Sequence, residues 1–315
     1  MEIDSTEAIQ QTFKRIPVFM YREPERRVAT LKSFKPRPTD IIIATPPKSG
    51  TTWTQQIVHG LRSGGSMDFS EISAVVPFIE ASGTTGIDLD TDHVAQPRAF
   101  KTHECYELCP KGAAKYLVVI RHPLDAYPSA YSFMNGWIIR PPGIVSPDAF
   151  IRTALSRDNP PQSFEERGVI ISVIQSWWKR RQDDNVLVVF YEDMIEDLPG
   201  AVKQMAEFIG CGAGDEELQK LVVKQASKDF MLANNSKFDD YLLKRAANKR
   251  IGLPEDAGCT AENSTVRGGG KGVRRRDLSP ESIAAINSKW TSLMEELTGC
   301  SSYDELRKKY GRLGK

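Results

Sequence analysis

DIIIATPPKSGTTW, residues 40–53, joins a short apolar run to a loop of proline, small and hydroxylated residues. The isoleucines of 40–44 are β-branched and stand between prolines, which is typical of a strand buried on both faces of a parallel sheet. Residues 49–61 follow with helical character. A strand, a glycine-containing loop and a helix in this order favour phosphate binding, because the N–H groups and the positive dipole end of the helix face the anion.

Two more apolar runs repeat this arrangement farther along the chain. Residues 116–120 and 186–190 are predicted to be buried strands, and helices are predicted at 124–133 and 200–209. Buried strands that alternate with helices predict an α/β fold with a parallel sheet. We therefore expect a single domain with a central parallel sheet flanked by helices and a P-loop-like phosphate-binding loop.

The rest of the chain lacks this alternation. Residues 1–39 are polar and basic with four prolines, and we expect an N-terminal arm packed on the main domain, which takes up 40–315. Residues 134–165 and 232–272 are rich in loop-forming residues and are expected to be long loops, which often carry function. A helical pattern returns at 280–297.

Composition narrows the class of protein. The 315 residues are 40% hydrophobic, enough for a substantial core. Because 42 basic residues nearly balance 41 acidic ones, neither nucleic acid nor an anionic membrane is expected as a partner. No apolar run reaches the roughly 20 residues of a membrane span, and the start lacks a signal-peptide pattern. With five scattered cysteines that fit reduced thiols, we expect a cytoplasmic protein.

The loop that follows the first strand differs from a Walker A loop, in which the lysine follows the last glycine. Here Lys48 precedes Gly50, whose missing side chain lets the backbone approach an anion closely. PKSGTTW at 47–53 resembles the phosphosulfate loop of the cytosolic sulfotransferase family, which uses 3′-phosphoadenosine 5′-phosphosulfate (PAPS) as its donor. The resemblance implies that Lys48 contacts the 5′-phosphate and the bridging oxygen and that Trp53 packs on the adenine. The residues implied to cradle the phosphosulfate are Ser49, Gly50, Thr51 and Thr52.

A second anion site is indicated after the next strand. Arg121 ends that strand and Ser129 lies two helical turns later, so both side chains are able to converge on one phosphate. An arginine in this position is as often part of a surface salt bridge, but the spacing resembles the family's 3′-phosphate site. VRGGGKG at 266–272 resembles the family's RKGxxG motif, unless it is a flexible linker. That resemblance implies Arg267 and the backbone of Gly268 and Gly269 as further 3′-phosphate ligands.

Two segments resemble the adenine side of the donor site. Tyr191 begins YEDM after the third strand, where the family's tyrosine reaches the adenine. Ser227 stands in ASKDFM, in place of the family's TSFxxM. Ala226 and Lys228 depart from that pattern, which implies weaker donor binding than is usual in the family.

Residues 97–103, PRAFKTH, resemble the family's KTH motif. A lone histidine at a strand end is more often structural, so the role of His103 as general base rests on this resemblance. Lys101 is implied to stabilise the transferring sulfonate. The resemblance implies a catalytic set of four residues, His103, Lys101, Lys48 and Ser129. It implies in-line displacement at sulfur without a covalent enzyme intermediate. No residues show metal-ligand spacing, so no metal is expected.

The acceptor side is the least defined. VPFIE at 76–80 resembles a segment bordering the family's acceptor pocket, which implies that Phe78, Lys101 and His103 contact the acceptor. Tyr131 and Phe133 are interpreted as core. An apolar lining suits a small alcohol, phenol or amine. Hydroxyl and amine acceptors both stay open, as does a P-loop kinase or NTPase-like protein. The family's dimerisation motif is not recognisable, so the oligomeric state stays open too.

Overall fold

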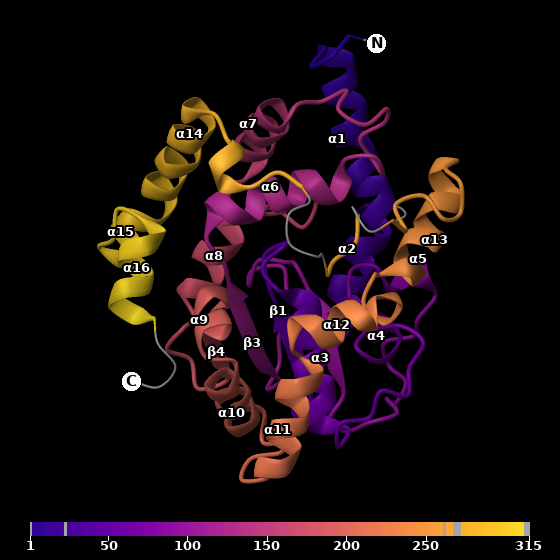
Figure 1. The fold of residues 1–315 in the computed structure, drawn as a ribbon, viewed down its shortest axis with the longest axis vertical. Coiled ribbons are helices and arrows are strands. Elements are labelled where there is room, and N and C mark those ends of the chain that lie inside the picture. Colours follow the sequence, from indigo (N-terminus) through magenta and orange to yellow (C-terminus); the bar gives the residue numbers. More distant parts are fainter. Residues whose placement is uncertain (1, 22–23, 261–262, 267–271, 312–315) are drawn as a thin grey trace.

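The computed structural model describes residues 2–21, 24–260, 263–266 and 272–311. At its centre is a parallel sheet, in which Figure 1 labels β1, β3 and β4. The strand order is β2-β1-β3-β4. The strands are β1 (Ile41–Ala44), β2 (Ala99–Thr102), β3 (Lys115–Ile120) and β4 (Val186–Phe190). The register places Ile42 of β1 beside Phe100 of β2 and Tyr116 of β3. The predicted α/β fold with a central parallel sheet is confirmed.

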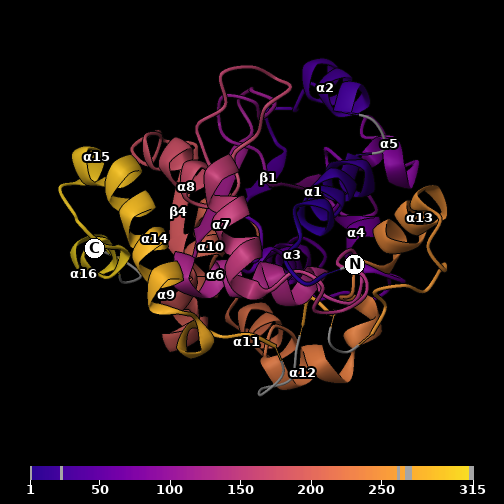
Figure 2. The same ribbon diagram turned by 90° about the horizontal axis from the view of Figure 1, so that it is seen from above.

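Both faces of the sheet are covered, as the continuous apolar runs require. Ile42 and Val118 pack with α6 (Pro123–Met134), α7 (Pro147–Arg157), α8 (Ile171–Trp178) and α14 (Pro280–Trp290). Ile41 and Ile43 point to the other face and pack with α3 (Thr51–Arg62), α10 (Leu198–Ile209) and α11 (Glu216–Gln225). Figure 2 shows helices on both sides of the strands. Alternate residues of one strand therefore belong to two different cores.

The remaining elements are short or peripheral. They are α4 (Ile72–Val75), α5 (Ser82–Thr85), α9 (Tyr191–Glu196), α12 (Lys228–Ala233), α15 (Glu296–Thr298), α16 (Tyr303–Tyr310), the 3₁₀ turns Asn235–Lys237 and Arg275–Asp277, and a π-helical turn at Thr291–Glu295 that continues α14. In the part of the chain that the structure describes, no helix combines the length and apolarity that crossing a membrane requires.

The N-terminal segment is helical. α1 (Thr6–Tyr21) and α2 (Pro24–Ser33) occupy most of the expected arm at 1–39. α1 contacts α5, α7 and α13 (Tyr241–Ile251), and Phe13 of α1 is buried against Phe150 of α7 with ring centroids 5.3 Å apart. The segment thus packs on the rest of the chain; the boundary at residue 39 stays an expectation.

The expectation of two long loops is wrong, because each contains a helix. α7 lies within 134–165, where the Ser146 hydroxyl accepts a hydrogen bond from the Ala149 N–H at 3.2 Å and Pro147 occupies the first turn. A serine cap followed by proline is a strong helix start. α13 lies within 232–272, and its Leu243 and Ala247 bury the face that packs under Trp137. Both helices border the cavity described below.

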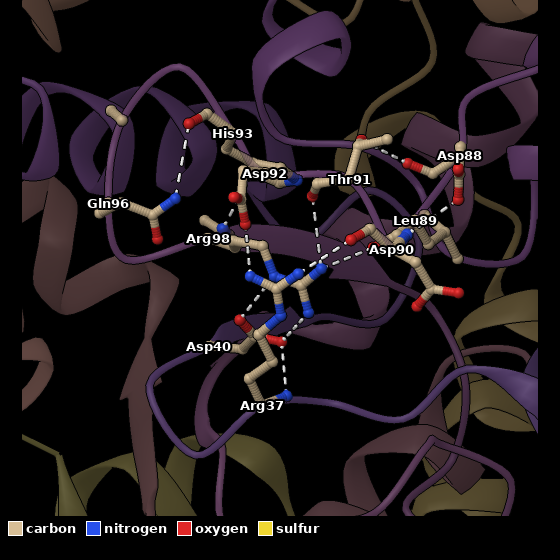
Figure 3. A network of polar contacts seen from close by, with 12 residues as sticks. Arg37, Asp40, Asp88, Leu89, Asp90, Thr91, Asp92, His93, Gln96 and Arg98 are labelled. Carbon is tan, nitrogen blue, oxygen red and sulfur yellow. Dashed lines mark hydrogen bonds and ion pairs between the residues drawn. The ribbon is translucent and has the colours of Figure 1, made fainter.

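A buried ion pair fixes the start of β1 and β2 (Figure 3). The Arg98 guanidinium donates to both carboxylate oxygens of Asp40, at 2.9 and 2.6 Å, and both side chains are fully buried. Arg98 also donates to the Leu89 carbonyl at 2.8 Å, and the Arg37 N–H donates to Asp40 at 2.8 Å. A bidentate pair with further hydrogen bonds is the form in which buried charge is tolerated. It lies at the amino end of the strands, and the cavity opens at the opposite, carboxyl end.

Candidate active site

The loop between β1 and α3 has an unusual backbone. Lys48 has φ 63° and Gly50 φ 93°, both left-handed. A β-carbon at Gly50 would lie 2.7 Å from Cδ2 of Tyr191, too close for any side chain. Strained backbone of this kind is found where a loop must present its N–H groups to a ligand. Glycine is therefore required here by conformation and by the ring that covers it.

Three strand ends are tied together around this loop. Arg121, after β3, donates from Nη1 to the Lys48 carbonyl at 2.9 Å, and its guanidinium lies 4.6 Å from the ring centre of Tyr191, after β4. The Tyr191 ring meets the Trp53 ring edge-on at 5.5 Å. Trp53 donates from Nε1 to the Ala226 carbonyl at 2.7 Å. The result is a cationic and aromatic wall with little freedom to rearrange.

A second group of site residues lies at the end of β2. The Lys101 N–H donates to the Pro77 carbonyl at 2.8 Å, and the Ile79 N–H donates to the Lys101 carbonyl at 3.0 Å. This pairing brings the Phe78 ring within 5.0 Å of the His103 ring. The backbone N–H of His103 donates to the buried Glu80 carboxyl at 2.7 Å, so the histidine is held from its main chain as well.

The imidazole of His103 has one defined partner. Its Nδ1 lies 2.8 Å from the carbonyl oxygen of Thr45, which can only accept a hydrogen bond. Nδ1 therefore carries the proton and Nε2 carries the lone pair. Burial lowers the pKa of His103 to about 3. The ring is neutral at pH 7, and its unprotonated nitrogen is the one not committed to the main chain.

Lys101 is held by a carboxylate from far along the chain. Its Nζ lies 2.6 Å from Oδ1 of Asp240, which also accepts from the Ser73 hydroxyl at 2.9 Å. Burial works to raise the pKa of Asp240, but the charge and hydrogen bond of Lys101 hold it below its ordinary value. Burial and the nearby charge of Asp240 raise the pKa of Glu71 to about 8. Asp240 is thus the charged member of this acidic pair and the partner of Lys101.

A single cavity of about 850 Å³ joins both groups. Of the residues singled out in the sequence, those that line it are Lys48, Gly50, Thr51, Thr52, Trp53, Phe78, Lys101, His103, Arg121, Ser129, Tyr191 and Ser227. Ser49 is buried and does not line the cavity. Arg267, Gly268 and Gly269 lie outside the described residues. Residues from six separate motifs therefore face one space.

The cavity also has walls that the motifs did not identify. Asp240, Arg157 and Arg167 line it, together with Phe13 of α1. Phe133, interpreted as core, is buried but also lines the cavity, with Nζ of Lys48 4.1 Å from its ring centre. No local sequence pattern identifies these four positions as lining residues. The serine cap of α7 and the apolar spacing of α13 are the sequence signals from which these two helices could have been predicted.

The charge of the lining is strongly one-sided. The cationic side chains are Lys48, Lys101, Arg121, Arg157, Arg167 and Lys228, and among the described lining residues the only carboxylate is that of Asp240. Such a lining suits a polyanionic ligand. Across the described residues, no group of three or more His, Cys, Asp or Glu side chains is arranged to hold a metal ion.

Comparison with known proteins gives consistent matches. Residues 38–298 match the family model described as the sulfotransferase domain. Sulfotransferase 1A1 of Bos taurus is 30% identical over 227 residues, which cover 69% of this chain and 73% of that protein. Sulfotransferase 1E1 of Bos taurus is 29% identical over 237 residues, covering 69% and 74%.

Solved structures share the fold. Retinol dehydratase in complex with androsterone and the inactive cofactor PAP has a TM-score of 0.67 at 18% identity, covering 88% of this chain and 87% of that one. Mouse sulfotransferase SULT7A1 complexed with PAP has a TM-score of 0.60 at 22% identity, covering 91% and 93%.

Proposed function

The chain belongs to the sulfotransferase domain family, and from that premise we propose that it transfers a sulfonate group from PAPS to the hydroxyl of a small organic acceptor. The observation that carries the proposal is the single cavity that is lined by a strained phosphate-type loop, by Lys48 and Lys101, and by the neutral His103. The family match also argues against the kinase or NTPase alternative.

The donor end of the cavity fits the charge of PAPS. The loop from Lys48 to Thr52 is suited to the 5′-phosphosulfate. Lys48 supplies a positive charge, and the left-handed backbone at Lys48 and Gly50 turns the N–H groups of the loop towards an anion. Arg121 and Ser129 are suited to the 3′-phosphate. Solved relatives crystallised with PAP, the adenosine 3′,5′-bisphosphate left after transfer, support this choice of donor.

Trp53 and Tyr191 offer aromatic surface for an adenine, and Ser227 lines the same wall. Trp53 is already fixed by its hydrogen bond to Ala226, whose carbonyl does not depend on the side chain. The replacement of the family's threonine by Ala226 therefore leaves this contact in place. Lys228 adds a cation to the same wall.

The acceptor end supplies a base. We assign proton removal to Nε2 of His103, because its Nδ1 proton is committed to the Thr45 carbonyl and the ring is neutral at pH 7. Phe78 and Phe133 bound the space beside it with apolar surface, which suits an organic body. Retinol dehydratase, whose solved structure holds androsterone, supports a small apolar acceptor.

The bound donor supplies an activated sulfur atom. The acceptor oxygen forms the new S–O bond, the bond from sulfur to the bridging oxygen breaks, and the proton passes to His103. Negative charge develops on the departing phosphate, while the transferring sulfonate is anionic throughout. Lys48 is suited to neutralise the phosphate and Lys101 the sulfonate, and fixed positive charge of this kind is the main means of stabilising such a transition state.

Calorimetric titration of the purified protein with PAP, and separately with ATP and magnesium, tests the donor assignment. Binding of PAP without metal and little response to ATP is expected. Incubation with PAPS and a panel of phenols, alcohols and amines then tests transfer, and the amine arm decides between hydroxyl and amine acceptors. Preference for ATP with magnesium, with no binding of PAP, would sink the proposal.

A further inference from the structure

The two ends of the cavity lie over different parts of the sheet. The donor-side residues follow β1, β3 and β4, whereas Lys101 lies in the edge strand β2 and His103 follows it. Another part of the wall is formed by α1, α7 and α13, whose lining residues Phe13, Phe150 and Leu243 are apolar. Under the proposed function, this apolar part of the cavity suits the body of the acceptor.

Two arginines border this acceptor side. Arg157 is the last residue of α7, and Arg167 stands in the segment before α8. Both line the cavity, Arg157 exposed and Arg167 half-buried. A β-carbon on Gly168, which follows Arg167, would lie 2.7 Å from Sγ of Cys105, two residues after His103, so this segment packs beside the base.

Asp158 joins the two segments that carry these arginines. It is fully buried, follows Arg157 directly, and accepts hydrogen bonds from the backbone N–H of Val169 at 3.0 Å and of Ile171 at 2.7 Å. It also accepts from the hydroxyl groups of Tyr127 and Ser172. A buried carboxylate held by this many donors fixes the chain on both sides of it. The two segments that carry Arg157 and Arg167 are thereby held together by one buried carboxylate.

Arg157 does not balance a carboxylate within the described chain. The guanidinium of Arg157 lies 4.8 Å from the ring centre of Phe13, and no ion pair joins it to a carboxylate among the side chains that the structure describes. The only lining carboxylate of the described residues, Asp240, is already paired with Lys101. The acceptor side thus carries positive charge beyond what the donor-side cations provide.

We propose that Arg157 and Arg167 form a binding site for an anionic group on the acceptor. The inference rests on the proposed function and narrows its substrate class: the acceptor has an apolar body, a hydroxyl that reaches His103, and a carboxylate or sulfate group that reaches the arginines. Guanidinium groups suit both anions because they present paired N–H donors.

The test uses a para-hydroxyphenyl alkanoate series of increasing chain length, the matching primary amides and the matching amines. Their binding to the protein saturated with PAP is measured by calorimetry. The best alkanoate is expected to bind about tenfold or more tightly than its amide, and the double variant Arg157→Gln/Arg167→Gln is expected to abolish that difference. An alkyl sulfate arm with the same ring distinguishes the two anions.

Arg152→Gln is the matched control, because Arg152 is exposed on the same helix but does not line the cavity. It is expected to leave the preference unchanged. Equal binding of alkanoates and amides, tightest binding of the amines, or no binding of any alkanoate would each overturn the inference. Failure of the wild-type protein to bind PAP would instead refute the proposed function, so the two failures are distinguishable.

Discussion

The donor end and the acceptor end of the cavity are built in different ways. At the donor end, Lys48, Arg121 and Tyr191 each stand within a few residues of a strand end, and hydrogen bonds and ring contacts tie them to one another. At the acceptor end, Lys101 is held by Asp240, 139 residues away, and the walls come from α1, α7 and α13. One end depends on the sheet, the other on how distant helices pack.

This difference has a chemical reason. The donor presents the same phosphates whatever the acceptor is, so backbone N–H groups and fixed cations at strand ends suffice to bind it. In the proposed function, the acceptor end has to fit the body of the acceptor, and helix side chains at that end are free to change without disturbing the sheet. We therefore expect substitutions at the donor end to affect PAP binding, and substitutions at the acceptor end to affect turnover and acceptor choice.

The largest effect is expected for His103→Ala. Removal of the base should lower kcat by about a thousandfold, within the range for loss of general base catalysis. PAP affinity, measured by calorimetry, should stay within about twofold because the donor-end contacts remain. His93→Gln is a suitable control, since His93 lies before β2 and away from the cavity lining. Near wild-type turnover in His103→Ala would mean that the base is misassigned.

Lys48→Ala tests the contribution of the donor end to PAP binding. Loss of a charged contact to phosphate should weaken PAP binding by about tenfold to a hundredfold and lower turnover with PAPS as well. Calorimetry with PAP and a steady-state assay measure the two effects. Lys203→Ala, an exposed lysine of α10, should change neither. Unchanged PAP affinity in Lys48→Ala would contradict the assignment of the loop.

Asp240→Asn tests whether the acceptor end affects turnover without affecting PAP binding. Asparagine keeps the size of the side chain but leaves the buried Lys101 ammonium without its counter-ion. The position of the Lys101 ammonium group is then less well fixed. We expect kcat to fall about tenfold with PAP affinity unchanged. A loss of PAP affinity as large as that of Lys48→Ala would break the division between the two ends.

The smallest effect is expected from pH. A histidine with an ordinary pKa near 6.5 would lose activity as a base below that pH, whereas a pKa of about 3 keeps His103 neutral at every higher pH. The pH profile of kcat/KM, which reports the free enzyme, should therefore stay level from about pH 7 down to about pH 5. A decline centred near pH 6.5 that disappears in His103→Ala would show that the ring titrates normally.

The same division explains which parts of the molecule are predictable from sequence. The strands β1, β3 and β4 are continuous apolar runs, and the residues after them carry the motifs, so the sheet and the donor-end positions follow from local pattern. The edge strand β2 is four residues long and contains a lysine. Its Lys101 pairs with the main chain of Pro77 and Ile79, and no local sequence pattern predicts this pairing.

The helices at the acceptor end were missed for a related reason. α7 lies in a segment rich in proline, glycine and asparagine, and α13 in one rich in glycine and asparagine. These residue types favour loops and outweigh the local signals of the serine cap at Ser146 and the Leu243–Ala247 spacing. The pairing of Lys101 with Asp240 and the tie made by Asp158 depend on tertiary packing. Contacts of this kind become visible only when the chain is folded.

The most direct measurement is a single-turnover reaction with PAPS labelled in the sulfonate group, with the protein in excess over PAPS and a panel of phenols, alcohols and amines as acceptors. Label should appear on an acceptor in step with release of PAP, with none retained on the protein and none transferred by His103→Ala. Label that remains in PAPS with every acceptor, or that becomes attached to the protein, would contradict direct transfer between the two ends of this cavity.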